Sequence, residues 1–322
     1  MKTTTWKRLT CLLLALLMML QLTYLPEATA YAIDSRQEAA DQIQEPSPSA
    51  VESEAVDKRE EEVKHFQMND GSYLAVAYGM PVHYKENGEW LDIDNRLTKT
   101  TDSYDVVSLQ TDGTTRAVSV HEDVWTNSAN SLRVTLPVKL TESSRIGLTH
   151  KGFTIRFSLI AGDCMSTAQV EDKMNGVCSD IESAIAVHAA SSLSYSAVLP
   201  GIDLRYDLVG SSLKENIILS SLKTTPDELT FALTAPGLEL HREGDELLFK
   251  AGEDDIFRFP APYMLDPEGA VGSVKAELRE QGKGEYLLIY KPDRAWLENR
   301  ERAWPVTVDP VTQVQTSRRR AP

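Results

Sequence analysis

Strict alternation of apolar and polar side chains is the feature that most constrains how this chain folds. Residues 153–159 read Phe-Thr-Ile-Arg-Phe-Ser-Leu, and residues 202–208 repeat the same period of two. Such a period places successive side chains on opposite faces of an extended strand, so that one face is apolar. Helical signal is thin: it covers residues 179–190 and 293–300, with a nascent helix around residues 56–64. We therefore expect a mainly β protein, built from antiparallel sheets that pack as one or two β-sandwiches.

Short glycine-containing dipeptides predict how the strands pair. Asn87-Gly88 is typical of a two-residue type I′ turn, because both central positions of that turn need positive φ. This turn would oppose Lys85 to Trp90 on one face of a hairpin. The same polar face would also hold His83 opposite Asp92, while the other face would be apolar, with Val82, Tyr84, Leu91 and Ile93.

Three further dipeptides predict hairpins of the same kind. The turns and the pairs that they predict are Asp112-Gly113 with Val107 opposite Val118, Gly244-Asp245 with Leu240 opposite Phe249, and Gly282-Lys283 with Leu278 opposite Leu287.

The first thirty residues have the pattern of a secretory signal peptide. Lys2, Lys7 and Arg8 precede an apolar run over residues 9–20, and Ala28-Thr29-Ala30 supplies small residues for cleavage. The apolar run is short for a membrane span, and no second long apolar run follows it. We therefore expect a secreted, extracellular chain without a membrane span after signal cleavage.

Composition divides the rest of the sequence. Residues 34–62 contain ten acidic and three basic side chains and few large apolar ones, so burial cannot offset the entropy of ordering this stretch. The predicted organisation is a signal peptide at 1–30, a disordered acidic linker at 31–62, an N-terminal β region at 63–160, an irregular, partly helical connection at 161–190, a C-terminal β-sandwich region at 191–310 and a truncated tail at 311–322.

Charge and cysteine content limit the expected partners. The formal net charge is −15, which would repel the phosphates of a nucleic acid, so we expect no nucleic-acid partner. Beyond the signal peptide only Cys164 and Cys178 remain, and their spacing fits either a disulfide or two free thiols. Two cysteines without a nearby pair of histidines match no zinc pattern, so the sequence predicts no metal and no cofactor.

Trp90, Lys85, His83 and Asp92 are the candidate ligand-binding residues. An exposed Trp90 beside Lys85 could stack on a sugar ring, whereas burial of Trp90 between sheets would exclude such a site. His83 opposite Asp92 has the arrangement of an oriented general base, yet no nucleophile is identifiable beside it. We therefore predict no catalytic residues and no enzymatic activity.

A second group of carboxylates follows the turn at Pro200-Gly201. Asp203 is expected to cap that turn by accepting hydrogen bonds from backbone amides. A calcium site built from Asp203, Asp207 and Glu215 would lack the Asp-, Asn- and Gly-rich loop that such sites use.

Three segments, taken in order, resemble a known protein family. They are residues 70–95, which end in Trp-Leu-Asp-Ile-Asp-Asn; residues 195–216, which end in Leu-Lys-Glu-Asn; and residues 296–310, which end in Trp-Pro-Val-Thr-Val-Asp-Pro. Together they resemble the N-terminal, pre-repeat region of secreted, wall-associated Rhs (YD-repeat) proteins of Gram-positive bacteria, many of which are polymorphic toxins. The resemblance covers residues 63–312.

The resemblance implies a secreted structural or adaptor module at the front of a cell-wall-associated, toxin-delivery protein. Its partners would be downstream modules of the same polypeptide or cell-wall glycan. The alternative is a glycan-binding module that recognises cell-wall polysaccharide through Trp90, Lys85, His83 and Asp92.

Overall fold

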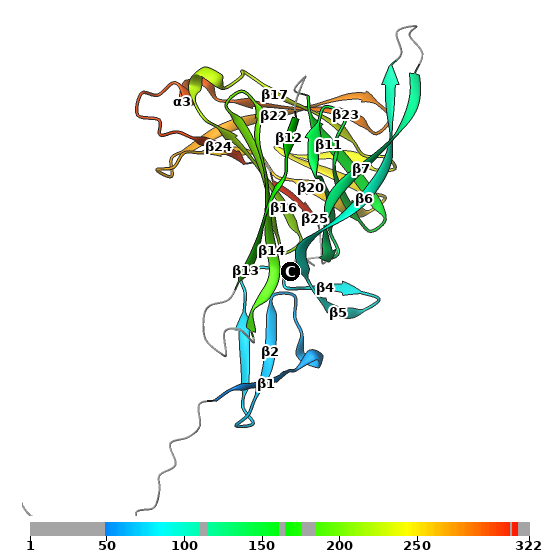
Figure 1. Ribbon diagram of the computed structural model, residues 1–322, viewed down its shortest axis with the longest axis vertical. Helices are drawn as coiled ribbons and strands as arrows, with labels where there is room; N and C mark the ends of the chain where they lie inside the picture. The colour runs from blue at the N-terminus through cyan, green and yellow to red at the C-terminus, as the bar shows by residue number, and fades with distance from the viewer. Residues whose placement is uncertain (1–48, 110–114, 161–164, 176–184, 310, 315–322) are drawn as a thin grey trace, which may run out of the picture. The chain divides into compact units, whose positions relative to one another are not determined.

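The computed structural model describes residues 49–109, 115–160, 165–175, 185–309 and 311–314 (Figure 1). The chain divides into two units, residues 1–47 and 48–322, and all described residues belong to the second unit. The predicted signal peptide at 1–30 therefore lies outside the described residues, as do Cys164 and Cys178. Within the described ranges no helix has the length and apolar character needed to cross a bilayer.

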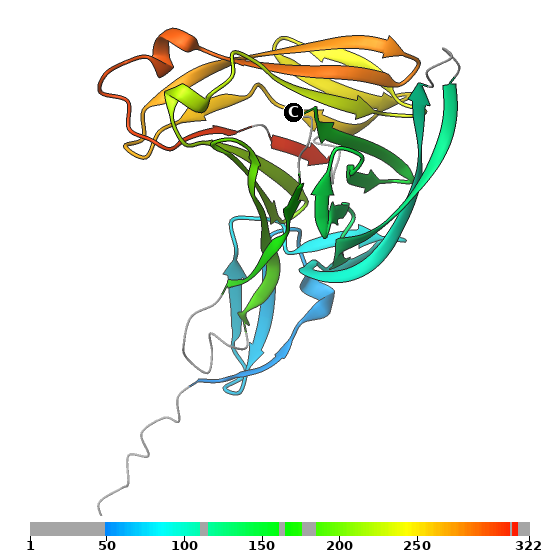
Figure 2. The same cartoon turned by 45° about the horizontal axis from the view of Figure 1, so that its top comes forward.

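Antiparallel strands dominate the described unit, which confirms the predicted mainly β fold. One large sheet contains most of the strands and curls until its two ends lie close together (Figure 2). From end to end its main course is β6 (Asp94–Leu109), β7 (Thr115–Ala129), β8 (Arg133–Pro137), β10 (Ile146–His150), β11 (Phe153–Leu159), β17 (Leu229–Thr234), β23 (Glu285–Pro292), β22 (Val271–Gly282), β21 (Tyr263–Leu265), β24 (Val306–Asp309), β16 (Ser212–Leu219), β15 (Ile202–Val209), β14 (Val187–Leu199) and β13 (Gln169–Asn175).

Four strands branch from β16, and smaller sheets complete the unit. The branch is β25 (Val311–Val314), β20 (Asp254–Phe259), β19 (Glu246–Ala251) and β18 (Glu239–Glu243). The small sheets are β1 (Val51–Glu54) with β2 (Val63–Met68) and β3 (Tyr73–Ala77), the hairpin β4 (His83–Glu86) with β5 (Glu89–Asp92), and β9 (Lys139–Thr141) with β12 (Met165–Thr167). The helical turns are η1 (Val56–Lys58), η2 (Leu222–Thr224) and α3 (Arg294–Leu297).

Strand β1 and turn η1 lie inside the stretch that composition marks as a disordered linker. Val51 and Glu54 pair with Met68 and Phe66 of β2, so the backbone of β1 finds partners despite its acidic sequence. The composition of residues 31–62 is an average over the whole stretch. It therefore does not reveal that the four residues of β1 form the edge strand of a sheet.

Two of the four turn dipeptides predict the register of their hairpins correctly. The β4–β5 register is the predicted one, and Asn87 and Gly88 have φ values of 51° and 91°, as a type I′ turn requires. Leu240 also pairs with Phe249 as predicted.

Two other hairpins form with a shift of one residue. Val107 pairs with Ala117, and Leu278 pairs with Leu288. In the second of these hairpins the register is irregular near the turn, where Gly284 has a φ of 75°.

Of the segments 179–190 and 293–300, the second contains a helix, whereas residues 187–190 of the first form a strand. Helix α3 forms within residues 293–300, because the Asp293 side chain accepts hydrogen bonds from the amides of Ala295 and Trp296. Residues 187–190, by contrast, begin β14 rather than continue a helix.

One hydrophobic core serves both predicted β regions. Ile155 and Phe157 of β11 and alternate residues of β15, such as Leu204, belong to the same buried cluster. The period of two holds in β15, where Ile202, Leu204, Tyr206 and Leu208 are buried and the residues between them are half-buried. Burial of apolar faces from both regions gives this shared cluster, and Val82, Ile93, Val187 and Ala189 form a second, smaller one.

Side-chain amides join the two ends of the curled sheet. Nδ2 of Asn95, in β6, donates to the carbonyl oxygens of Ala189 at 2.7 Å and Gly210 at 2.9 Å. Oδ1 of Asn95 accepts from Nδ2 of Asn127 at 3.3 Å and of Asn130 at 2.9 Å. We call Asn95, Asn127 and Asn130 the amide network. It satisfies buried polar groups that strand pairing would otherwise satisfy.

Candidate functional site

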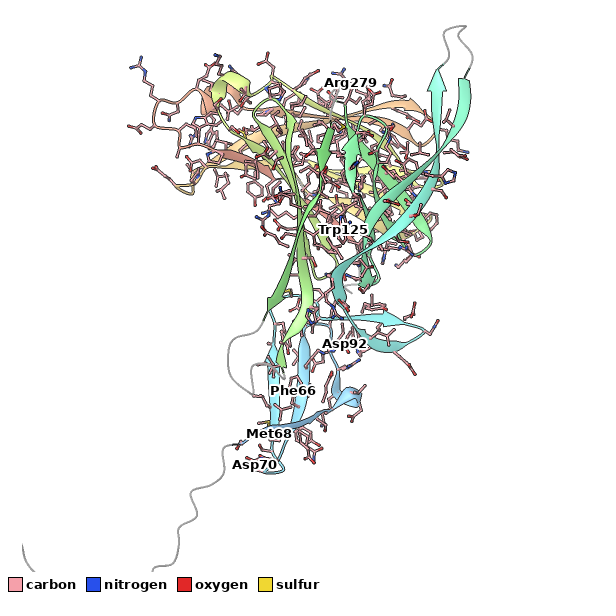
Figure 3. All side chains as sticks on the ribbon, viewed as in Figure 1. Phe66, Met68, Asp70, Asp92, Trp125 and Arg279 are labelled. Carbon is pink, nitrogen blue, oxygen red and sulfur yellow. The ribbon has the colours of Figure 1, made fainter. Side chains whose placement is uncertain are left out.

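The β4–β5 hairpin places all four predicted ligand-binding residues on one face, but its two ends have different surroundings. Lys85 and Trp90 pair near the turn, and His83 and Asp92 pair at the open end. Figure 3 labels Asp92, which lies beside β2, where it contacts Lys64. The candidate site therefore separates into a pocket near the turn and an ionic cluster at the open end.

The pocket near the turn has a volume of about 270 Å³. Trp90 is half-buried, and Nζ of Lys85 lies 4.6 Å from the centroid of its ring. The hairpin forms one wall, and the β7–β8 and β10–β11 turns form the other. The lining residues are Tyr84, Lys85, Glu86, Trp90, Asn130, Ser131, His150 and Lys151. An aromatic ring beside amide, hydroxyl and ammonium groups is the chemistry that binds polar, ring-shaped ligands.

The ionic cluster at the open end joins the hairpin to β1 and β2. Arg59 contacts both carboxylates: its Nε lies 2.7 Å from Oε1 of Glu54, and its Nη2 lies 2.7 Å from Oδ2 of Asp92. Lys64 contacts Oδ1 of Asp92. We call Glu54, Arg59, Lys64, His83 and Asp92 the Glu54 cluster.

Partners within the Glu54 cluster set its protonation. Burial, the largest single effect, would raise the pKa values of Glu54 and Asp92, but the hydrogen bonds and the charges of Arg59 and Lys64 together outweigh it and lower both. Burial lowers the pKa of His83, and the charges of Lys64 and Arg59 act in the same direction. The hydrogen bond from His83 to the Glu60 carbonyl opposes this shift only in part, so the imidazole is neutral at pH 7.

Sequence reasoning did not find Glu54, Arg59 and Lys64. Glu54 and Arg59 lie in the stretch assigned to a linker, and Lys64 follows it directly. The one available signal was Lys58-Arg59, the only adjacent pair of cations between residues 34 and 62.

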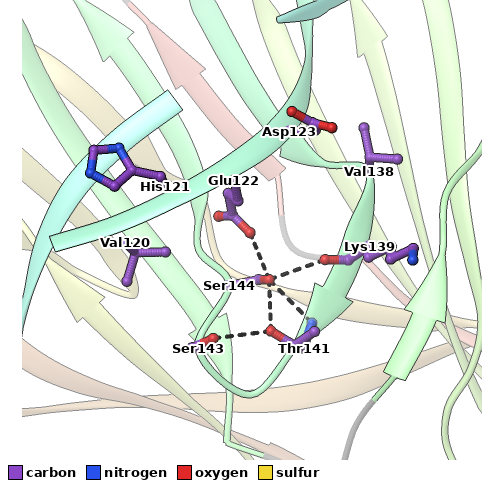
Figure 4. Close-up of a pocket in the computed structure, with 9 residues that line it drawn as sticks. All are labelled: Val120, His121, Glu122, Asp123, Val138, Lys139, Thr141, Ser143 and Ser144. Carbon is purple, nitrogen blue, oxygen red and sulfur yellow. Dashed lines mark hydrogen bonds between the residues drawn. The ribbon is translucent and has the colours of Figure 1, made fainter. Parts of the chain in front are cut away.

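A second pocket lies where β7 faces the turn after β9, and its volume is about 340 Å³ (Figure 4). Oγ of Ser144 donates to Oε2 of Glu122 at 2.8 Å, and the hydroxyl of Tyr104 donates to Oε1 at 2.6 Å. The His121 ring does not point toward Ser144 in Figure 4. Among the described residues the hydrogen-bond partners of the Ser144 hydroxyl are Thr141, Glu122 and Lys139, and these contacts hold the turn against β7.

The carboxylates considered for calcium do not converge. Oδ1 of Asp203 accepts from the amide of Ala197 at 2.6 Å, so Asp203 holds the turn before β15. Asp207 is half-buried and bonds to Asn216, whereas Glu215 is buried and accepts from the hydroxyl of Tyr206. Burial raises the pKa of Glu215 to about 7.

Residues of the segments that carry the family resemblance make contacts that hold strands of the fold together. Asn95 ends the first segment and belongs to the amide network. Lys214 of the second segment contacts Asp309 of the third, with Nζ 2.6 Å from a buried carboxylate oxygen. These residues fix how β6, β14, β16 and β24 meet. Their contacts therefore serve the fold.

Comparison with known proteins gives relatives of low identity. No family model matches the chain, and no solved structure matches it. The tRNA(Glu)-specific nuclease WapA of Bacillus subtilis subsp. natto is 25% identical over 286 residues, which is 85% of this chain and 11% of that protein. The tRNA3(Ser)-specific nuclease WapA of Bacillus spizizenii is 25% identical over 279 residues, 83% of this chain and 11% of that protein.

A third relative is covered over most of its length. The wall-associated protein of Geobacillus stearothermophilus is 19% identical over 238 residues, which is 73% of this chain and 83% of that protein. In contrast, the chain spans only about a tenth of the length of the nuclease relatives. The similarity to wall-associated proteins agrees with the resemblance found in the sequence and confirms the predicted location at the cell wall.

The comparisons contradict two expectations. The prediction of no enzymatic activity and the prediction of no nucleic-acid partner are both wrong, because these relatives are named as tRNA nucleases. The physical reason is the difference in length between this chain and the relatives. Net charge and motif content describe only the residues that carry them, and the relatives are far longer than this chain.

Proposed function

We propose that this chain is the wall-associating module of a protein that acts on tRNA. The observation that carries the proposal is the distribution of the similarity. The same region matches relatives named for two different tRNAs, and it also matches most of a protein named only as wall-associated. A region common to proteins with different tRNA substrates is best explained by the property that they share, which is association with the wall.

The fold is suited to this role. A large shared core and a sheet with its ends tied by the amide network make a rigid unit, and rigid units present attached parts in a defined way. The acidic composition keeps such a unit soluble outside the membrane.

Fractionation of cells that export the complete chain tests the proposal. We expect the chain in the wall fraction, released by enzymes that digest peptidoglycan. An exported protein of similar size and charge without this fold is the control, and it should appear in the medium. Recovery of the complete chain in the medium would contradict the proposed association.

Binding of wall glycan at the hairpin pocket is the second candidate function. The observation that favours it is the half-buried Trp90 in a pocket of about 270 Å³ whose other walls carry amide, hydroxyl and ammonium groups. Pockets for small ligands measure roughly 300–1,000 Å³, so this pocket, at about 270 Å³, is at the lower limit and suits a ligand no larger than about one sugar ring.

Sedimentation with purified wall polysaccharide tests the second candidate. Trp90→Ala is expected to weaken retention about tenfold or more, because the aromatic face supplies the stacking surface. Tyr73→Ala is the matched control: Tyr73 is an exposed aromatic residue with a lysine ammonium, Nζ of Lys58, 4.9 Å from its ring centroid, and it does not line the pocket. Equal retention of both variants would contradict a glycan site at Trp90.

A further inference from the structure

The Glu54 cluster brings three atoms with lone pairs together at the open end of the hairpin. Nε2 of His83 lies 3.5 Å from Oδ1 of Asp92 and 3.6 Å from Oε1 of Glu54. One ligand atom from each of the three residues can be chosen so that all lie within 4.8 Å of one another. The residues come from β4, β5 and β1, and therefore no spacing in the sequence marks them.

His83 has the orientation of a metal ligand. Its side chain is fully buried, and its Nδ1 lies 2.5 Å from the carbonyl oxygen of Glu60. A carbonyl oxygen only accepts, so Nδ1 carries the proton and Nε2 carries the lone pair. Nε2 is buried and has no hydrogen-bond partner within the described part of the chain. Metal-bound histidines show the same pattern, because a hydrogen bond from the other ring nitrogen fixes the ring.

The distances suit a bound cation better than direct contact. At 3.5 and 3.6 Å the ring nitrogen is too far from either carboxylate for a good hydrogen bond, and lone pairs that face one another repel. Two ligands that each lie about 2.1 Å from a tetrahedral metal ion are roughly 3.4 Å apart. A metal ion among the three atoms would therefore need little rearrangement of His83.

Arg59 and Lys64 determine how strongly such an ion can bind. Arg59 donates to both oxygens of Glu54, and Nζ of Lys64 lies 3.5 Å from Oε2, whereas Oε1, the oxygen that faces His83, keeps a second lone pair. Arg59 can thus remain a partner of a metal-bound carboxylate. Lys64 contacts Oδ1 of Asp92, the oxygen that faces His83, so its ammonium group competes directly with a metal ion.

We propose that Glu54, His83 and Asp92 bind a divalent transition-metal ion of the Zn²⁺ class, in competition with Lys64, and that the ion ties β1 to the hairpin. One imidazole nitrogen with two carboxylates suits Zn²⁺ better than Mg²⁺ or Ca²⁺, which prefer oxygen ligands. Three protein ligands leave a fourth position of a tetrahedral ion for water. This inference is independent of the proposed function.

Calorimetric titration of the complete chain with Zn²⁺ alone tests the site. We expect a binding event that Mg²⁺ does not produce. His83→Gln should abolish this event, and Lys64→Gln should strengthen it about tenfold or more, because the competing ammonium is gone. His241→Gln is the matched control, since His241 is an exposed histidine 3.7 Å from a carboxylate oxygen of Glu239, and it should leave the binding unchanged.

Two measurements separate this site from other causes of binding. Cobalt(II) substituted for zinc should give visible bands without the near-ultraviolet band of thiolate ligands, which excludes Cys164 and Cys178 as ligands. Circular dichroism in the presence of a chelator should show that both variants fold. The proposal is overturned if the unaltered chain binds no Zn²⁺, if His83→Gln binds as before, or if Lys64→Gln does not raise the affinity.

Discussion

At the scale of single residues, the least expected feature is a carboxyl group in the core that forms no ion pair among the described residues. Glu215 is buried, and its described hydrogen bond comes from the hydroxyl of Tyr206. Burial raises the pKa of Glu215 to about 7, since a charge in the apolar interior loses its hydration. The folded protein therefore keeps this carboxyl protonated at pH values where the unfolded chain has lost the proton.

Glu215→Gln is expected to change the pH dependence of stability. Below pH 4.5 the carboxyl is protonated in both states, and between pH 4.5 and about 7 only the folded state keeps the proton, so stability falls as the pH rises through this window. The shift corresponds to roughly 3 kcal/mol. Urea unfolding at pH 5 and pH 8 should show that the variant loses less stability than the unaltered chain between these values. An identical loss in both proteins would contradict the buried, protonated carboxyl.

Asn95→Ala is expected to destabilise the fold by about 1–3 kcal/mol, because it removes one of the two donors to each of the Ala189 and Gly210 carbonyls, and the acceptor of the Asn127 and Asn130 amides. Chemical unfolding measures this difference. Ser128→Ala serves as a control, since the Ser128 hydroxyl is exposed and makes a single bond to a nearby carbonyl. A loss for Asn95→Ala no greater than that of the control would mean that the amide network contributes little.

At the scale of elements, the hairpins were the most predictable part of the fold. Asn87-Gly88 encodes its turn through backbone conformation, so two adjacent residues determine the register of β4 and β5. The alternation in β11 and β15 is equally local, and both strands form where the sequence predicts them. Short sequence patterns suffice to predict an element when its cause is a backbone torsion angle or the alternation of side chains between the two faces of a strand.

Gly88→Ala is expected to destabilise the hairpin by about 1–2 kcal/mol. The residue has a φ of 91°, and an added Cβ would meet no atom within 4 Å, so the cost arises from the backbone conformation alone. Hydrogen exchange of the β4 and β5 amides should accelerate in this variant. Asn87→Gly, which tolerates positive φ, should leave the exchange nearly unchanged; equal acceleration in both variants would contradict the type I′ turn.

The Glu54 cluster and the amide network were not predictable in the same way. Glu54 meets His83, and Asn95 meets Gly210, only because strands from distant parts of the chain are brought together. No short pattern encodes such a meeting, and the acidic composition around Glu54 favours a different interpretation. The candidate residues Trp90 and Lys85 were found because they share one hairpin, whereas the partners of His83 and Asp92 lie outside it.

At the scale of the whole molecule, β24 and β25 hold the sheet together. Both pair with β16, and they connect it to β21 and β20. Val306, Val308 and Val314 of these strands are buried in the core. The final strands therefore join the main course of the sheet to its branch.

A chain that ends at residue 305 is expected to lose cooperative unfolding. It lacks three core side chains, each worth about 1.5–3 kcal/mol, and it leaves β16 without its partners on one side. A chain that ends at residue 314 keeps both strands and should unfold like the complete chain. Thermal unfolding followed by circular dichroism compares the two, and a sharp transition in the shorter chain would contradict this role.

The pairing of β16 with β24 also has a consequence for export. Ile217 pairs with Val308, which leaves the secretion channel only after most of the intervening strands have emerged. Until then one side of β16 offers unpaired peptide groups to any neighbouring strand, including one from a second emerging chain. The time between the emergence of β16 and that of β24 therefore sets how long this edge stays open to another chain.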